Sequence, residues 1–327
     1  MAKGNNDTAA LIIAFLVTAG LLGGGFWFFS RNSPQLGELG GKPGETLDPT
    51  ARSSATPQNA TDTTVPNLDT SLPNPAVLTM DGSVTMVALM KQLQIAYTQV
   101  NPSLQTTYGL PDGKPNGTNA GIRNLVEGRA LIAASSRPLK PDEYQAGLQG
   151  IPIAKDALAV VVGIDNPYKG ELTSQQLKQI FQGQITNWSQ VGGPALPIKV
   201  INRSSDSGTY TFFKDVVLLE QAFAPDGPNF TTAKQDETTP LLKQLGRNGI
   251  TYSTVQQVEK QRTVRIVPID GLLPTDQDAI KNGTYPLGRV IYLAVPKQTS
   301  PAVKQFIDMV RSPRGQQVVQ RVGFLPL

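Results

Sequence analysis

The chain has 327 residues, a formal net charge of +4, and neither histidine nor cysteine. The missing residue types exclude Ser-His-Asp and Cys-His catalysis, thiol redox chemistry, zinc sites built from Cys and His, and disulfides. An enzyme would have to rely on carboxylate, lysine or hydroxyl groups, so the composition favours a binding function over catalysis.

Residues 9–29 form an uncharged, apolar stretch. About 20 apolar residues are enough for a helix to cross the hydrocarbon core of a bilayer, so we expect one uncleaved transmembrane anchor. A cleaved signal peptide is the alternative, but the stretch is long for one and ends in aromatic residues instead of a small-residue cleavage site. Since no cysteine is available for covalent lipid attachment, the polypeptide itself would have to anchor the protein in the membrane.

A flexible linker is expected from residue 30 to about residue 75, where Gly, Pro, Thr, Ser and Asn dominate and no periodic apolar run occurs. The remainder of the chain alternates short apolar strands with amphipathic helices, which is the pattern of an α/β protein. It is long enough to form two lobes.

Two glycine- and hydroxyl-rich turns open helices in the first part of this region. A strand at 77–80 leads through Gly82, Ser83 and Thr85 into a helix, and the turn at 116–121 contains Thr118. Glycine allows the backbone to turn tightly, and the hydroxyl groups can either cap the helix or bind a ligand at its N-terminus. Both interpretations remain open for each turn taken alone.

A third turn adds a cation to the same pattern. After a strand at 197–201, Arg203 precedes Ser207, Gly208 and Thr209, which open another helix. Free N–H groups in a first helical turn carry partial positive charge, and an arginine contributes a planar fork of donors. The alternative is an ordinary helix cap with a surface arginine nearby. Three such turns together favour a site for a small tetrahedral oxyanion, because that ligand needs many converging donors.

Other ligand classes find less support in the sequence. No Lys/Arg cluster with interleaved aromatic residues occurs, so we expect no nucleic-acid binding. The acidic pairs at 236–237 and at 276 with 278 do not match metal-ligand spacing, so we assign no metal and no cofactor. A carboxylate-based hydrolase is disfavoured because the three turns hold no pair of acids, and we expect no catalytic residue.

Five segments, in order, resemble the phosphate-binding component of phosphate ABC transporters. The resemblance covers nearly everything from about Ala76 to Leu327. The segments are residues 81–85, 131–139, 183–193, 202–209 and 285–289.

The resemblance implies a two-lobed α/β periplasmic-binding-protein fold of type II. Lobe I would comprise residues 76–157 and 288–327, and lobe II residues 158–287, with a hinge that closes the lobes over the ligand. It further implies a domain outside the cytoplasmic membrane, with residues 1–8 in the cytoplasm, that passes inorganic phosphate to an ABC permease. We expect the protein to be monomeric.

The resemblance also implies a ligand site shared by the two lobes. Lobe I would supply hydroxyl groups, and lobe II would supply an arginine and the helix turn that follows it. The expected ligand-binding residues are Ser83, Thr85, Thr118, Ser136, Arg137, Arg203, Ser207, Gly208 and Thr209.

One position departs from the best-known members of this family. There an aspartate just before a Pro-Leu pair faces the anion, whereas this chain has Ser135, Ser136 and Arg137. The carboxylate accepts the proton of hydrogen phosphate and disfavours sulfate. Asp81 or Asp206 could serve as a substitute acceptor, although the composition of their turns favours helix capping for both.

Arg137 itself has two open interpretations. It could be a second cation for the anion, or it could form an ion pair with Asp142 and Glu143.

A second function remains open alongside transport. A tethered phosphate sensor or envelope scaffold could keep the same fold, and the uncleaved anchor with its long linker favours this alternative. Transport requires reversible anion binding and a permease, whereas a scaffold tolerates an inactive site and needs a protein partner.

Overall fold

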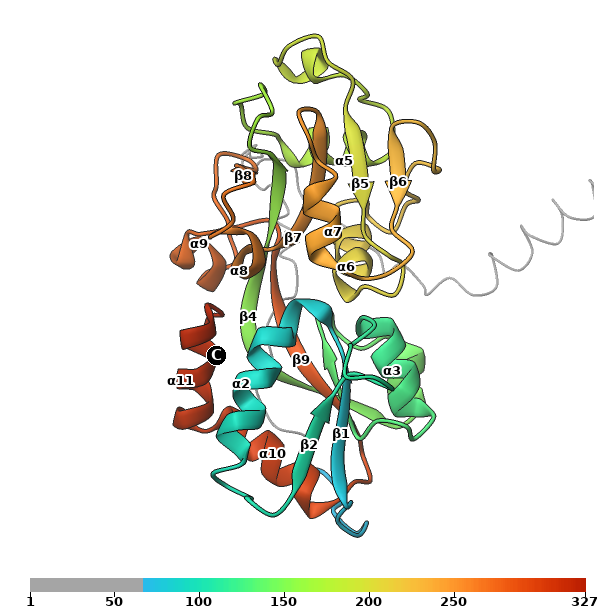
Figure 1. Ribbon diagram of the computed structural model, residues 1–327, viewed down its shortest axis with the longest axis vertical. Helices are drawn as coiled ribbons and strands as arrows, with labels where there is room; N and C mark the ends of the chain where they lie inside the picture. The colour runs from blue at the N-terminus through green and yellow to red at the C-terminus, as the bar shows by residue number, and fades with distance from the viewer. Residues whose placement is uncertain (1–66) are drawn as a thin grey trace, which may run out of the picture. The chain divides into compact units, whose positions relative to one another are not determined.

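The computed structural model describes residues 67–327, which form an α/β fold of two lobes (Figure 1). The predicted anchor at 9–29, the tail at 1–8 and most of the predicted linker lie outside the described residues. Within residues 67–327, no helix is both long and apolar enough to cross a bilayer. The strands follow the order β2-β1-β3-β9-β4-β7-β5-β6, and β8 pairs with β4.

Lobe I consists of the elements around the first half of β4 (Leu148–Gly163). β1 is parallel to both β2 and β3, and β9 lies antiparallel between β3 and β4. The other strands are β1 (Val77–Gly82), β2 (Gln105–Tyr108), β3 (Ile132–Ser135) and β9 (Gly288–Pro296). The helices are η1 (Val84–Met86), α2 (Val87–Tyr97), α3 (Thr118–Val126), α4 (Pro141–Gln145), α10 (Pro301–Arg311) and α11 (Pro313–Val322).

Lobe II contains the elements around the second half of β4. Here β7 and β8 flank β4 in antiparallel pairing, and β5 is parallel to β6 and β7. The strands are β5 (Lys199–Asn202), β6 (Phe230–Thr232), β7 (Gly249–Thr254) and β8 (Val264–Val267). The helices are α5 (Ser174–Phe181), η2 (Trp188–Val191), α6 (Gly208–Val216), α7 (Thr238–Lys243), α8 (Val255–Val258) and α9 (Gln277–Lys281).

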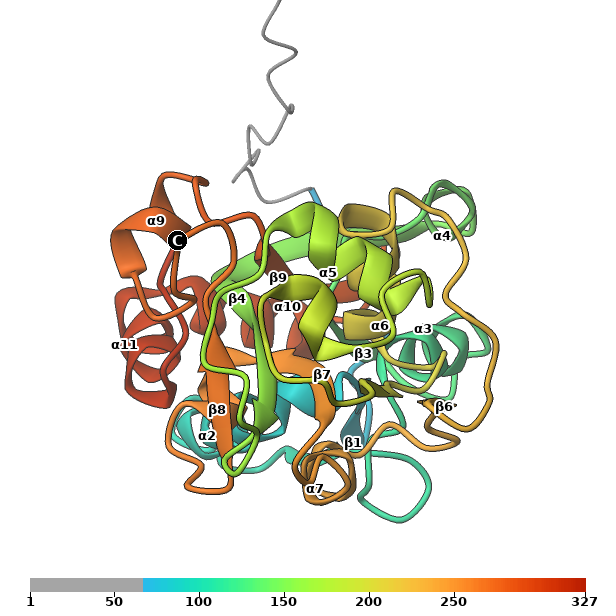
Figure 2. The ribbon, with the colours of Figure 1, turned by 90° about the horizontal axis from the view of Figure 1, so that it is seen from above.

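Helices cover both faces of the lobe I sheet. In α2 the residues Leu89, Met90, Leu93 and Tyr97 are fully buried, a spacing of three to four that places them on one helix face. They share a core with apolar residues of α10 and α11, whereas α3 packs on the other face with β1 and β3. Accordingly, α11 and α3 lie on opposite sides of the strands in both views (Figures 1 and 2).

Two chain segments join the lobes. The first half of β4 pairs with β9 and its second half pairs with β7 and β8. The N–H of Leu158 donates to the carbonyl of Leu287 (3.0 Å), so the two crossings lie side by side. The predicted lobe boundaries at 157–158 and 287–288 stay a prediction, and they fall at this contact.

The folded domain begins earlier than the sequence predicted. Within the segment predicted as linker, Leu68 is buried in the lobe I core. Asp69 exchanges backbone hydrogen bonds with Lys297 and Thr299 (2.9 and 2.7 Å). A single buried leucine in a stretch rich in polar residues carries no periodic signal, which is why the prediction ran on to residue 75.

Candidate anion-binding site

The turn between β5 and α6 places Arg203 deep inside lobe II. Its Nε donates to Ser207 Oγ (3.0 Å), and its Nη2 forms an ion pair with Asp236. Nη1 donates at longer range to Thr238 Oγ1 (3.3 Å) and Ser253 Oγ (3.4 Å). The arginine is fully buried, so it is a fixed cation at the N-terminus of α6 and not the surface arginine of the alternative interpretation.

Three hydroxyl groups of lobe I meet beside this turn, and we call them the hydroxyl cluster: Ser83, Thr85 and Ser136. Thr85 Oγ1 lies 2.9 Å from Ser83 Oγ and 2.8 Å from Ser136 Oγ, and the two serine oxygens are also hydrogen-bonded. Ser83 and Ser136 follow β1 and β3, which are parallel neighbours, so their carboxyl ends meet at one edge of the sheet. Thr118 joins them by accepting the N–H of Ser136 (3.1 Å).

At none of the three predicted turns does a side-chain hydroxyl group cap the helix that follows. The residues before η1, α3 and α6 are Ser83, Gly117 and Ser207, and none of them makes a side-chain cap hydrogen bond. The capping alternative is therefore not realised at the three turns, and their hydroxyl groups instead contact one another, an arginine or, for Thr118, the N–H of Ser136.

The turns of the two lobes are in direct contact. Gly208 at the start of α6 lies against Thr118 at the start of α3. Gly117 lies equally close to the backbone of Asp206 and approaches the Asp236 carboxylate. The structure thus brings together eight of the nine predicted residues, namely Ser83, Thr85, Thr118, Ser136, Arg203, Ser207, Gly208 and Thr209.

Arg137 is directed elsewhere. Its guanidinium pairs with Glu143 (2.6 and 2.8 Å), and it also donates to Asn119 Oδ1 (2.7 and 3.0 Å). It donates as well to the carbonyl of Pro138 (2.8 Å). These contacts correspond to the ion-pair interpretation, with Glu143 and not Asp142 as the acid, and the prediction of Arg137 as a second cation at the anion is not supported by its geometry.

Sequence reasoning missed a buried arginine that contacts the predicted site, in addition to Arg203. Arg289 donates from Nη1 to Thr209 Oγ1 (2.9 Å) and forms an ion pair with Asp156 (2.6 Å). Burial lowers the pKa of Arg289, and the nearby carboxylate of Asp156 opposes that shift. The signal available in the sequence was its place in the family-like segment 285–289, where a crossing between the lobes was expected but no ligand-site residue.

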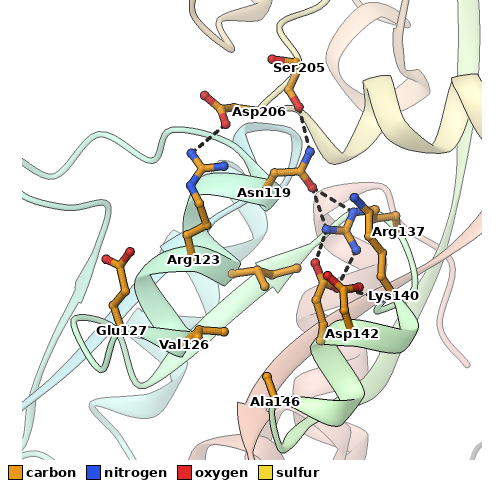
Figure 3. A pocket seen from close by; sticks show the side chains of 12 residues that line it. Asn119, Arg123, Val126, Glu127, Arg137, Lys140, Asp142, Ala146, Ser205 and Asp206 are labelled. Carbon is orange, nitrogen blue, oxygen red and sulfur yellow. Dashed lines mark hydrogen bonds and ion pairs between the residues drawn. The ribbon is translucent and has the colours of Figure 1, made fainter. Parts of the chain in front are cut away.

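Side chains at the rim also cross between the lobes (Figure 3). Asn119 Nδ2 donates to Ser205 O (2.7 Å) and Thr211 Oγ1 (3.1 Å), and Arg123 pairs with Asp206 (2.8 Å). Asn119, Arg123, Ser205 and Asp206 border a surface pocket of about 460 Å³. Asp206 is therefore engaged at the exposed rim, not beside the hydroxyl cluster.

Two buried tyrosines fix the backbone that carries the site. Tyr108 donates its hydroxyl to the carbonyl of Ser83 (2.6 Å), and Tyr252 donates to Asn202 Oδ1 (2.7 Å), one residue before Arg203. Burial raises the pKa of both phenols well above the ordinary value. Both therefore stay neutral and remain donors at neutral pH.

Two of the three acidic groups around the site are paired with arginine, and the third uses only one of its oxygens. Asp236 and Asp156 are bound to arginine, and Asp81 accepts a hydrogen bond from Asn124. In residues 67–327 no group of three or more acidic side chains is arranged to hold a metal ion. The converging donors and helix N-termini are the arrangement that binds a small anion, and the carboxylates of Asp156 and Asp236 serve to hold the two arginines in place.

Comparison with known proteins gives the family. Residues 54–314 match the model of the PBP superfamily domain. A phosphate-binding protein PstS of Borreliella burgdorferi is 30% identical over 77% of this chain and 90% of that protein. The PstS of Pseudomonas aeruginosa strain PAO1 is 32% identical over 75% of this chain and 81% of that protein.

A solved structure agrees in fold. A putative phosphate ABC transporter substrate-binding protein from Clostridium perfringens, solved with bound phosphate, has a TM-score of 0.67 and 29% sequence identity. The match covers 77% of this chain and 99% of that one. This chain therefore belongs to the PBP superfamily and, within it, to the PstS-like family of periplasmic binding proteins.

Proposed function

We propose that this protein binds inorganic phosphate between its two lobes and delivers it to an ABC permease. The observation that carries the proposal is the meeting of the hydroxyl cluster of lobe I with Arg203 and the α6 turn of lobe II in one buried polar site. Support also comes from the relatives, whose names describe phosphate-binding proteins of this family. Binding and lobe closure are the whole mechanism, with no group transferred.

In this mechanism each lobe has its own task. Arg203 and the free N–H groups at the start of α6 attract the anion and bind it first by charge and hydrogen bonds. The hydroxyl cluster and Thr118 then close over it from lobe I. The closed form is the shape that the permease would recognise.

The proton of hydrogen phosphate needs an acceptor, and we assign that role to the hydroxyl cluster. A hydroxyl group can accept as well as donate a hydrogen bond, so Ser83, Thr85 or Ser136 can receive this proton without a free carboxylate. The same hydroxyl groups can turn and donate to sulfate. We therefore expect phosphate to bind more tightly than sulfate, but by a smaller margin than in a site with an unpaired carboxylate.

We further propose that residues 9–29 anchor the protein in the cytoplasmic membrane, with the two-lobed domain outside. The support is the length and apolar character of that stretch. Alkaline extraction of membranes should leave the full chain in the pellet, and external protease should digest the domain in spheroplasts. Release by alkali, or protection from the protease, would contradict this topology.

Calorimetric titration of the full chain in detergent tests the ligand. Phosphate, arsenate and sulfate are added separately after an enzymatic phosphate scavenger has removed any phosphate that was carried over. We expect saturable phosphate and arsenate binding and weaker sulfate binding. No heat with any of the three anions would overturn the proposed function.

A further inference from the structure

Arg289 lies at the point where the chain crosses between the lobes. It is the second residue of β9, and its partner in the register with β4 is Asp156. Its Nε and Nη2 both donate to Asp156 Oδ2 (2.8 and 2.6 Å). Both side chains are about 1% exposed, and the other carboxylate oxygen of Asp156 accepts the hydroxyl of Thr254. The ion pair is thus neutral overall and rigidly placed.

The remaining nitrogen of Arg289 contacts both lobes at once. Nη1 donates to the carbonyl of Ser136 (3.1 Å), in the hydroxyl cluster of lobe I, and to Thr209 Oγ1 (2.9 Å), in the first turn of α6 in lobe II. The guanidinium also lies over the ring of Phe212, 5.7 Å from its centroid. Arg289 lies on a strand that crosses between the lobes. It can make both of these hydrogen bonds only when the two binding turns have the relative position seen here.

The hydrogen bond from Arg289 determines where the hydroxyl proton of Thr209 can point. A guanidinium has donors and no acceptor, so Thr209 Oγ1 must accept from Arg289 and its own hydrogen must point elsewhere. Arg203 does the same to Ser207, whose Oγ accepts from Nε. Both hydroxyl groups in the α6 turn are thereby left as donors.

We propose that Arg289 is a positioning residue of the anion site: it sets Thr209 as a hydrogen-bond donor toward an unprotonated oxygen of the anion and favours closure by contacting both lobes. This inference rests on the proposed function. It assigns the charge-bearing, unprotonated face of the anion to α6 and the protonated face to the hydroxyl cluster.

The test removes the ion pair without leaving a buried acid unpaired, because an unpaired buried charge is strongly destabilising. In the full chain, Arg289→Met is combined with Asp156→Asn, whose carbonyl still accepts from Thr254. We expect phosphate affinity to fall by about ten- to hundredfold, the scale for a lost charged hydrogen bond, mainly through faster dissociation. Arg265→Met is the control, because Arg265 lies on β8, also beside β4, and donates to Tyr168 O far from the site.

A double-mutant cycle separates positioning from general stability. Phosphate affinity is measured for Thr209→Val alone and for Thr209→Val combined with the Arg289→Met/Asp156→Asn pair. A second combination joins Thr209→Val with Arg289→Lys. If Arg289 acts through Thr209, the loss of affinity in the combined variant is much smaller than the product of the separate losses. Independent, multiplying losses would overturn the inference, as would unchanged affinity in the pair variant.

Two further outcomes are distinguishable. If the pair variant fails to fold, Arg289→Lys replaces it in the double-mutant cycle. Lysine keeps the positive charge but lacks the planar group of donors that reaches Asp156 and Thr209 together. If the unmodified chain binds no phosphate, the proposed function fails, and this inference fails with it. Phosphate binding by the unmodified chain with equal binding by the variants contradicts only the inference.

Discussion

Gly208 and Thr118 lie closer together than any side chain at residue 208 would allow. A Cβ atom on Gly208 would come within 2.3 Å of Thr118 Oγ1 and 2.6 Å of Thr118 Cβ. Gly208 opens α6 in lobe II and Thr118 opens α3 in lobe I. The absence of a side chain at 208 is therefore what lets the N-termini of the two helices approach each other.

Gly208→Ala should weaken phosphate binding. Alanine suits the helical backbone at this position and keeps the N–H group, so the change acts through the clash with Thr118. Overpacking typically costs about 1–3 kcal/mol, and we expect the affinity to fall by a comparable free energy. The ligand-free protein can relieve the clash by opening, so its thermal unfolding midpoint should change little.

Gly227→Ala is the matched control. Gly227 is also in lobe II, and a Cβ built on it would have no neighbour within 4 Å. Titration calorimetry should give wild-type affinity for this variant. Wild-type affinity in Gly208→Ala as well would mean that the bound state does not close to the contact seen between residues 208 and 118.

Arg203 should contribute separately to ligand affinity and to folding. Arg203→Ala is expected to reduce phosphate affinity by about 1.5–3 kcal/mol or more, the scale for losing a charged hydrogen-bond partner. It also leaves Asp236 buried without its cation, so the variant should be less stable to urea.

Combining Arg203→Ala with Asp236→Asn separates the two effects. The second substitution removes the unpaired charge, so urea stability should largely return while phosphate affinity stays low. Recovery of affinity together with stability would show that Arg203 supports the fold and does not bind the anion.

The turns of the site could be predicted because each is a local pattern. Ser83, Thr118 and the Arg203 turn all lie where an apolar strand or a glycine leads into a helix, and the parallel arrangement of β1 and β3 brings such turns to one edge. The alternation of strands and helices also predicted the α/β class, whereas the two lobes were implied by the family resemblance and allowed by the length.

The partners of the arginines could not be predicted in this way. Asp156 faces Arg289 only because β4 and β9 pair in one particular register, across 133 residues of sequence. Asp236, 33 residues after Arg203, lies in a stretch that has the composition of a polar loop. The side chain of Arg137 was ambiguous because Glu143, six residues on, becomes its partner only once α4 has formed.

Asn119 should contribute more to closure than the ion pair beside it. Its backbone N–H donates to Asp206 O (3.0 Å), and its side chain donates to Ser205 O and Thr211 Oγ1 across the lobes. Neutral hydrogen bonds contribute about 0.5–1.5 kcal/mol each. Asn119→Ala removes both side-chain bonds and should therefore weaken phosphate binding by about five- to a hundredfold in calorimetric titration.

Arg123→Ala provides the comparison for Asn119→Ala. The Arg123 and Asp206 side chains are 58% and 39% exposed, and exposed ion pairs contribute little because water and salt screen them. We expect less than a threefold loss of affinity, vanishing at high salt. A larger effect for Arg123→Ala than for Asn119→Ala would reverse this assignment of the interlobe contacts.

Asp81 should make the folded protein less stable as pH rises. It is fully buried, one of its oxygens has no hydrogen-bond partner, and burial raises its pKa above the ordinary value of 3.8 despite the hydrogen bond from Asn124. Between that ordinary value and the raised one, the folded state binds more protons than the unfolded state, so the free energy of unfolding falls as pH increases through this window.

Asp81→Asn removes the titration while keeping the shape of the side chain. The stability of the variant should therefore fall less than that of wild type as pH rises. The difference in free energy of unfolding, variant minus wild type, should be more positive at pH 7 than at pH 4. Urea unfolding at both pH values measures the difference. Parallel pH profiles for the two proteins would mean that Asp81 titrates alike in the folded and unfolded states, and that water reaches its unpaired oxygen.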